Sequence, residues 1–199
     1  MSHVLEVFEF VAVGVAVSIA VCAASASAHR RSVASRALDR YAQSRGLVFV
    51  PAPSVPRGAS PRVLGAKDGV SFSVELYRLG GELRTRVSAS VVRRAPVLSV
   101  LQRRAFPTRK PAVLQSGDDT FDQAYVVTAG TAEDAQGLCD IARALLLLDA
   151  RREGVWLSSN GRNVTISWSG IESDPIVLDV ARDAAVLVGG WHRPDSAYR

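Results

Sequence analysis

Alternation of apolar and polar residues dominates the middle of the chain and predicts an antiparallel sheet. In residues 70–77, Val, Phe, Val and Leu alternate with Ser, Ser, Glu and Tyr, which gives a strand one buried and one wet face. Asp68-Gly69 and Asn160-Gly161 are typical of the tight turns that join hairpin strands. Further strands are expected at residues 47–50, 62–67, 82–92, 97–104, 124–128, 155–159 and 162–168.

A second spacing, with apolar residues three or four apart, predicts two helices that cover this sheet. The first spans residues 132–148 and the second begins at Asp174-Pro175 and ends at Gly189-Gly190. The same spacing predicts a further helix at residues 29–46, which is basic and stops at Gly46.

An apolar run near the amino terminus has a different pattern. Phe10 to Ala28 are nineteen residues without a charge, which as a helix would measure about 28 Å. That length is close to the roughly 30 Å hydrocarbon core of a bilayer. The run has no polar face, which argues against a helix in a soluble core. The sequence therefore predicts a transmembrane helix at residues 10–28.

Flanking charges predict the orientation of that helix. Acidic residues precede the run and basic ones follow it, among them Arg30, Arg31, Arg36 and Arg40. Basic flanks stay in the cytoplasm, so the domain is expected on the cytoplasmic face of the inner membrane with the amino terminus outside. The alternative is a signal peptide cleaved near residues 24–28, which would leave a periplasmic or secreted domain. The acidic flank disfavours that alternative.

Small residues recur every four positions within the apolar run, at Ala12, Ala16 and Ala20. Such a stripe lets two membrane helices approach closely, so a homodimer through these residues is one hypothesis. An alanine-rich composition without any partner explains the same pattern.

Together these elements predict an α+β fold, with an N-terminal transmembrane helix followed by an antiparallel sheet packed with two helices. The expected segments are a tail at 1–9, the transmembrane helix at 10–28, a basic juxtamembrane helix at 29–46, a single domain at 47–190 and a tail at 191–199.

The charge distribution adds one candidate partner. Residues 30–110 hold seventeen Lys and Arg against four acids, a balance of +13, whereas residues 111–199 have a balance of −6. A basic segment beside a membrane is attracted to anionic headgroups, so Arg30, Arg31, Arg36 and Arg40 are candidate lipid-surface contacts. Nucleic-acid binding is not expected, because the chain shows no recognition helix, zinc finger or RNA-binding aromatic motif.

Motifs for catalysis or cofactors are not found in the sequence. The three histidines and two cysteines lack metal-ligand spacing, and no glycine-rich loop precedes a helix to bind phosphate. We therefore predict no catalytic residue, metal or cofactor. One acidic cluster, Asp118, Asp119 and Asp122, could support acid–base chemistry with Arg109 as a basic clamp, but a solvated turn explains it as well.

The segment Phe121-Asp122-Gln123-Ala124-Tyr125-Val126-Val127 resembles a strand of uncharacterised bacterial single-pass membrane-anchored proteins, which are grouped as a domain of unknown function. In that group a leucine-rich helix, a hairpin and a final helix follow the strand. Residues 62–86, with Gly65 and Asp68-Gly69, are similar to its upstream part. The resemblance implies no reaction and no catalytic residues.

Three functional hypotheses follow. The first is a membrane-tethered, non-enzymatic interaction module on the cytoplasmic face, with the lipid bilayer and an unknown protein as partners. The second is a sensor of anionic lipid surfaces. The third is a hydrolase or transferase near the membrane that uses the acidic cluster.

Overall fold

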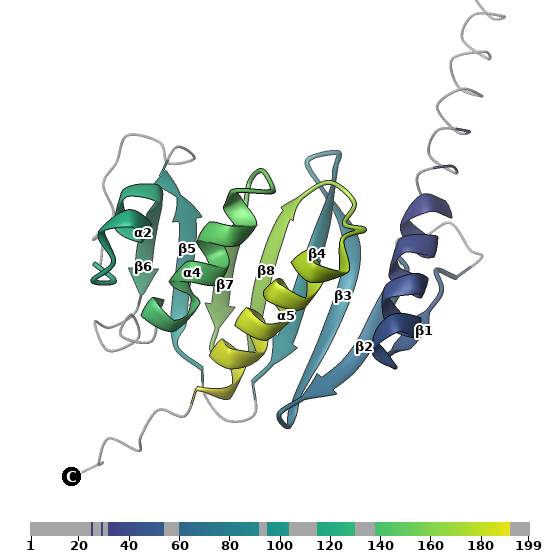
Figure 1. Ribbon diagram of the computed structural model, residues 1–199, viewed down its shortest axis with the longest axis horizontal. Coiled ribbons are helices and arrows are strands. Elements are labelled where there is room, and N and C mark those ends of the chain that lie inside the picture. Colours follow the sequence, from purple (N-terminus) through teal and green to yellow (C-terminus); the bar gives the residue numbers. More distant parts are fainter. Residues whose placement is uncertain are drawn as a thin grey trace, which may run out of the picture.

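The computed structural model describes residues 25, 29, 32–53, 60–91, 95–103, 115–129 and 138–191. In these residues eight strands form one sheet in the order β1-β2-β3-β4-β8-β7-β5-β6 (Figure 1). The strands are β1 (Val48–Val50), β2 (Arg62–Lys67), β3 (Val70–Leu79), β4 (Glu82–Ser90), β5 (Val97–Gln102), β6 (Tyr125–Ala129), β7 (Trp156–Asn160) and β8 (Asn163–Ser169). All neighbouring strands are antiparallel.

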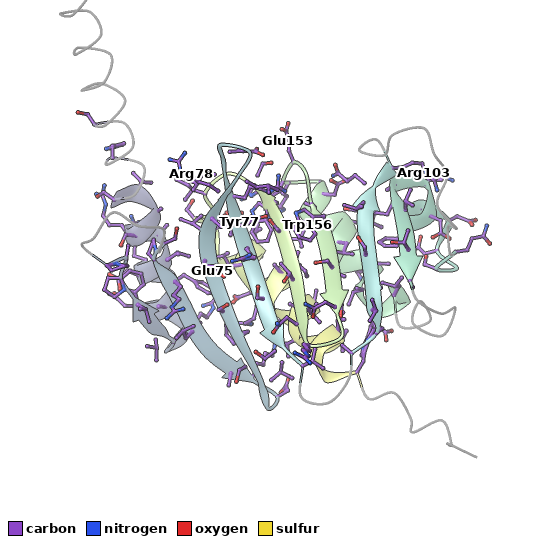
Figure 2. The ribbon with its side chains drawn as sticks, turned by 180° about the vertical axis from the view of Figure 1, so that it is seen from behind. Glu75, Tyr77, Arg78, Arg103, Glu153 and Trp156 are labelled. Carbon is purple, nitrogen blue, oxygen red and sulfur yellow. The ribbon has the colours of Figure 1, made fainter. Side chains whose placement is uncertain are left out.

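Four helices accompany the sheet in the described part of the chain. They are a helix at residues 32–45, α2 (Asp119–Ala124), α4 (Leu138–Asp149) and α5 (Pro175–Gly190). Figure 1 shows the 32–45 helix, α4 and α5 on one face of the sheet. Seen from behind in Figure 2, the other face has no described helix across it, and we call it the open face.

The hydrophobic core lies between the sheet and the helix layer. Strand alternation places a row of fully buried side chains, one on each of the seven strands β2 to β8, beneath the helices, and these side chains have relative exposures of 0–1%. In register order they are Val63, Val74, Val87, Ile166, Leu157, Val100 and Val127. Full burial of a side chain of this size stabilises the fold by about 1.5–3 kcal/mol. This row therefore fixes which face of each strand points inward.

The 32–45 helix belongs to the same core. Ala34, Leu38, Tyr41 and Ala42 on its inner side are buried with the sheet residues. At its end, a polar network joins it to Asp179 of α5. The Tyr41 hydroxyl donates to Asp179 Oδ1 at 3.0 Å, and Arg45 Nη2 lies 2.6 Å from Oδ2. Apolar packing and this network together hold the helix against α5.

The predicted fold class is wrong in its membrane helix and in its helix count. Within the described residues, no helix is both long enough and apolar enough to cross a membrane. The longest helix in the described part of the chain, α5, has sixteen residues and carries Asp179, Arg182 and Asp183. Residues 10–28, apart from Ser25, lie outside the described residues, and so do Ala12, Ala16 and Ala20. The transmembrane and single-pass assignments are corrected accordingly.

The number of helices that accompany the sheet is four and not two, because the prediction placed neither the 32–45 helix nor α2 against the sheet. The 32–45 helix was expected beside a membrane, yet it packs into the core. A solvated turn was one explanation of the acidic cluster, yet α2 begins there with Asp118 as its N-cap, whose side chain accepts from Phe121 N at 3.0 Å. An aspartate at this position satisfies a free backbone N–H, which favours a helix start as well as a turn.

Gly65 allows the segment that follows the 32–45 helix to pack closely against the sheet. It lies on β2 opposite Phe72 of β3. A Cβ atom at Gly65 would be 2.6 Å from Leu47 Cδ2 and 2.7 Å from Phe72 Cζ. Those separations are shorter than van der Waals contact, so a side chain at this position would displace both neighbours.

We expect Gly65→Ala to lower the free energy of unfolding by about 1–3 kcal/mol, because overpacking forces core side chains off their rotamers. Urea denaturation measures this loss. Ala66→Ser, at the next and exposed position, is the control and should change stability by less than about 0.5 kcal/mol. Equal midpoints for the two variants would contradict the packing described for Gly65.

Asp179 gives the fold a dependence on pH. Burial opposes its ionisation, but hydrogen bonds from Arg45 and Tyr41 and the nearby Arg182 outweigh burial and hold the pKa of Asp179 below its ordinary value of 3.8. A depressed aspartate pKa stabilises the fold fully above the ordinary pKa, and this stabilisation is lost as pH falls through the folded pKa.

Asp179→Asn should therefore lower stability at neutral pH by about 1–2 kcal/mol, because it removes a partly buried ionic partner. The difference between variant and wild type should begin to shrink as pH falls below 3.8 and should be lost below the lower folded pKa of Asp179, where the wild-type carboxylate is also protonated. Thermal unfolding across acidic pH measures both effects. Asp39→Asn, on the same layer and hydrogen-bonded to the exposed Gln43, is the control at neutral pH. A difference that stays constant into acid would refute the assignment.

Candidate functional site

Five side chains gather on the open face over four adjacent strands. Tyr77 comes from β3, Arg84 and Arg86 from β4, Ser167 from β8 and Trp156 from β7. We call them the open-face cluster. Strand alternation puts them there, because each is next in sequence to a residue buried under the helices. Figure 2 shows Tyr77 and Trp156 on this side of the sheet, together with Glu75.

Ser167 lies at the centre of the cluster and is fully buried, although no described helix covers this face. The Tyr77 hydroxyl and Ser167 Oγ are 2.7 Å apart, and Arg84 Nε donates to the same Oγ at 3.4 Å. Ser167 is paired in register with Arg86 on one side and with Trp156 on the other. The larger side chains around it thus exclude water from the serine.

Arg86 is held in a fixed position by two partners on β3. Its Nη2 and Nε donate to Glu75 Oε1 at 2.8 and 3.1 Å. Its guanidinium carbon lies 4.6 Å from the centroid of the Tyr77 ring, a cation–π contact worth about 0.5–1 kcal/mol at an exposed site. Both contacts orient the guanidinium, so binding a partner would cost little further side-chain entropy.

Arg84 is the most deeply buried cation of the cluster, with 7% of its surface exposed. Its Nη2 donates to the Gly154 carbonyl at 2.6 Å, and its Nη1 donates to Ser169 Oγ at 3.1 Å and to Glu82 Oε2 at 3.2 Å. Gly154 has a φ of +63°, which favours glycine, and belongs to the loop that enters β7. Arg84 thereby ties that loop to the open face.

Beside the cluster runs a row of hydroxyl side chains, one on each of six neighbouring strands. Register places them in an unbroken line: Ser73, Ser88, Thr165, Ser158, Ser99 and Thr128. Strands lie about 4.8 Å apart, so the row spans roughly 24 Å. We call it the hydroxyl row. Each hydroxyl can both donate and accept, so the row provides an uncharged hydrogen-bonding surface.

The predicted acidic cluster has a structural role. Asp118 caps α2, and Asp122 accepts from Ser116 N at 3.0 Å and from Ser116 Oγ at 2.9 Å. Asp119 is exposed in the first turn of α2. Among the described residues, no group of three His, Cys, Asp or Glu side chains could hold a metal ion. Arg109, the expected clamp, lies outside the described residues.

The structure describes two of the four predicted lipid contacts. Arg36 and Arg40 are exposed on the 32–45 helix, whereas Arg30 and Arg31 lie outside the described residues. The register pairs Trp156 with Ser167, so Trp168 is on the opposite face and is fully buried.

The open-face cluster was missed in the sequence because its members come from both halves of the chain. Alternation correctly placed Tyr77 on the wet face of its strand. The pairing of β4 with β8, which puts both arginines beside Ser167 and Ser169, leaves no local mark in the sequence.

Comparisons with known proteins found little similarity. No family model matches the chain, and no curated protein matches it. Among solved structures, the crystal structure of the mycobacterial trehalose monomycolate transport factor A is similar, with a TM-score of 0.48 and 16% sequence identity. The match covers 78% of this chain and 92% of that one. At this level it carries no argument about function, so the functional proposals depend on the residues themselves.

We expect Arg84→Ala to lower the free energy of unfolding by about 2–3 kcal/mol, because hydrogen bonds to a charged group are lost and the Gly154 carbonyl loses its donor. Arg84→Lys should not restore stability, since an ammonium cannot reach three separate acceptors in the guanidinium geometry. Urea denaturation measures both. Arg78→Ala, which removes an exposed arginine at the end of β3, is the control. Wild-type stability in Arg84→Ala would refute the tie between Arg84 and the loop.

Proposed function

We propose that this protein is a non-enzymatic interaction module that binds a partner protein through the open-face cluster. One observation carries the proposal. The sheet face without a described helix across it brings together Tyr77, Arg86 and Trp156 from β3, β4 and β7. Tyr, Trp and Arg are the residue types enriched at the energetic centres of protein interfaces. A surface that served only to meet water would carry more Lys and Glu.

The geometry supports binding because the cluster is organised before any partner arrives. Arg86 is fixed by Glu75 and Tyr77, and Tyr77 is fixed by Ser167. A partner therefore meets side chains that have already lost their rotamer freedom, which reduces the entropy cost of association.

The hydroxyl row supports the same function. Aromatic anchors beside small hydroxyl residues resemble the composition of antibody binding loops, where Tyr and Trp give rigid contact area and Ser gives adaptable hydrogen bonds. Here Trp156 and Ser158 of the row are two residues apart on β7, so they share the open face of that strand. Ser158 is in turn paired with Thr165 and Ser99. The row and the cluster thus form one continuous surface.

The third hypothesis, a hydrolase or transferase, is not proposed further. Asp118 and Asp122 are engaged in capping and holding α2. Arg84 and Arg86 are engaged by carboxylates and carbonyls of the fold. The polar groups that we have described hold structure in place and do not converge on a position where a substrate could react.

Trp156→Ala should weaken partner binding about 30-fold or more, because truncation of an aromatic residue at an interface centre costs about 2 kcal/mol or more. Proteins cross-linked to the tagged full chain in its own cells are quantified by mass spectrometry. Ile176→Ala is the control, since Ile176 is 60% exposed on α5, in the helix layer.

A second variant separates loss of binding from loss of folding. Ser158→Arg removes no buried apolar group and places a long cation on the hydroxyl row, so it should block binding while its unfolding midpoint stays near wild type. Recovery of the same partners at wild-type amounts by Ser158→Arg and Trp156→Ala would overturn the proposal. An equal loss in Ile176→Ala would place the interface on the helix layer instead.

A further inference from the structure

Two exposed arginines lie on the outer face of the 32–45 helix. Arg36 and Arg40 are four residues apart and share this face with Val33, which is 38% exposed. Neither arginine forms an ion pair with a carboxylate that the structure describes. Asp39, the acidic residue between them, accepts a hydrogen bond from Gln43.

Four basic side chains near the helix layer contrast with this pair. Arg45 and Arg182 are bound to Asp179, Arg152 is bound to the buried Glu172, and Lys67 is 2.8 Å from Asp183. The fold thus uses these cations to neutralise its own carboxylates. Arg36 and Arg40 are left with charge that can attract an external anion.

Overall charge reinforces the local pattern. The basic half of the sequence, residues 30–110, includes the 32–45 helix and β1 to β5, while the acidic half includes α4 and α5. An uneven charge distribution of this kind turns a molecule toward an oppositely charged surface before contact. The 32–45 helix lies at one end of the sheet, over β1 and β2, as Figure 1 shows. That end would approach an anionic surface first.

We propose that the face formed by Val33, Arg36 and Arg40 binds peripherally to an anionic lipid surface. A lipid surface fits better than nucleic acid for two reasons. Two cations are few for binding a duplex, which relies on many phosphate contacts, whereas anionic headgroups are attracted by each cation separately. The exposed Val33 also suits the boundary between headgroups and acyl chains, where apolar and basic side chains act together.

The contact leaves the proposed partner surface free. The 32–45 helix and the open-face cluster lie on opposite faces of the sheet (Figures 1 and 2). Anchoring of Arg45 and Tyr41 to Asp179 keeps the helix in place while its outer face is engaged. The lipid proposal therefore does not rest on the interaction-module proposal, and either can fail alone.

The test is co-sedimentation of the full chain with vesicles of phosphatidylcholine alone or of phosphatidylcholine and phosphatidylglycerol in equal parts. We expect the wild type to bind the anionic vesicles more tightly, and added salt to reduce this preference. The double variant Arg36→Gln, Arg40→Gln should lose about 30-fold of it, since each arginine near an anionic surface contributes a factor of roughly five.

The matched control is Arg143→Gln, Arg162→Gln, which removes the same charge from exposed positions on α4 and in the β7–β8 turn. It should retain most of the preference for anionic vesicles. Equal loss in both double variants would show that net charge alone governs binding and would overturn the assigned face. Wild-type binding by Arg36→Gln, Arg40→Gln would overturn it too, as would tighter, Arg36- and Arg40-dependent binding to duplex DNA than to the anionic vesicles.

Discussion

Seven residue pairs join β4 to β8, and through them two groups of strands far apart in the sequence become one sheet. One group is the meander β1 to β4, and the other is built from β5, β6, β7 and β8. The same pairing buries Val87 against Ile166 on one face and sets Arg86 beside Ser167 on the other. Because side chains alternate along a strand, a slip of one residue here would move the core side chains to the open face and break the cluster.

Strand alternation and turn motifs predicted the features that depend on residues close together in the sequence. The Asp68-Gly69 turn, with a φ of +52° at Asp68, was expected and is confirmed. The hairpin around Asn160-Gly161 was also expected and is confirmed, although its register makes Gly161 and Arg162 the two turn residues. The position of β5 between β7 and β6 could not be derived, since each of its two partners lies at a distance in the sequence that alternation does not specify. The same is true of the cluster, whose arginines and serines meet only through tertiary pairing.

The error over the amino-terminal region has a related cause. Hydropathy measures how well a segment would suit a bilayer. The apolar run at residues 10–28 was therefore predicted to cross a membrane, and the helix at 29–46 was expected beside the membrane because it follows that run. Its inner residues have the spacing of any helix that packs on a sheet, and Leu38 and Tyr41 are buried against this one. An amphipathic helix beside an apolar run thus has two explanations in sequence, and burial distinguishes them.

Arginine has two different roles in this fold, and its carboxylate neighbours determine which one it takes. Where a strand or helix packs against another, Arg84, Arg86 and Arg182 are fixed by acids and carbonyls and act as parts of the scaffold. On the outer face of the 32–45 helix, Arg36 and Arg40 have no described carboxylate partner and retain an unneutralised field. A sequence shows only that the chain is basic. The pairing of charges separates the arginines that shape the open face from those that can attract a surface, and it assigns the two proposed contacts to opposite sides of one rigid sheet.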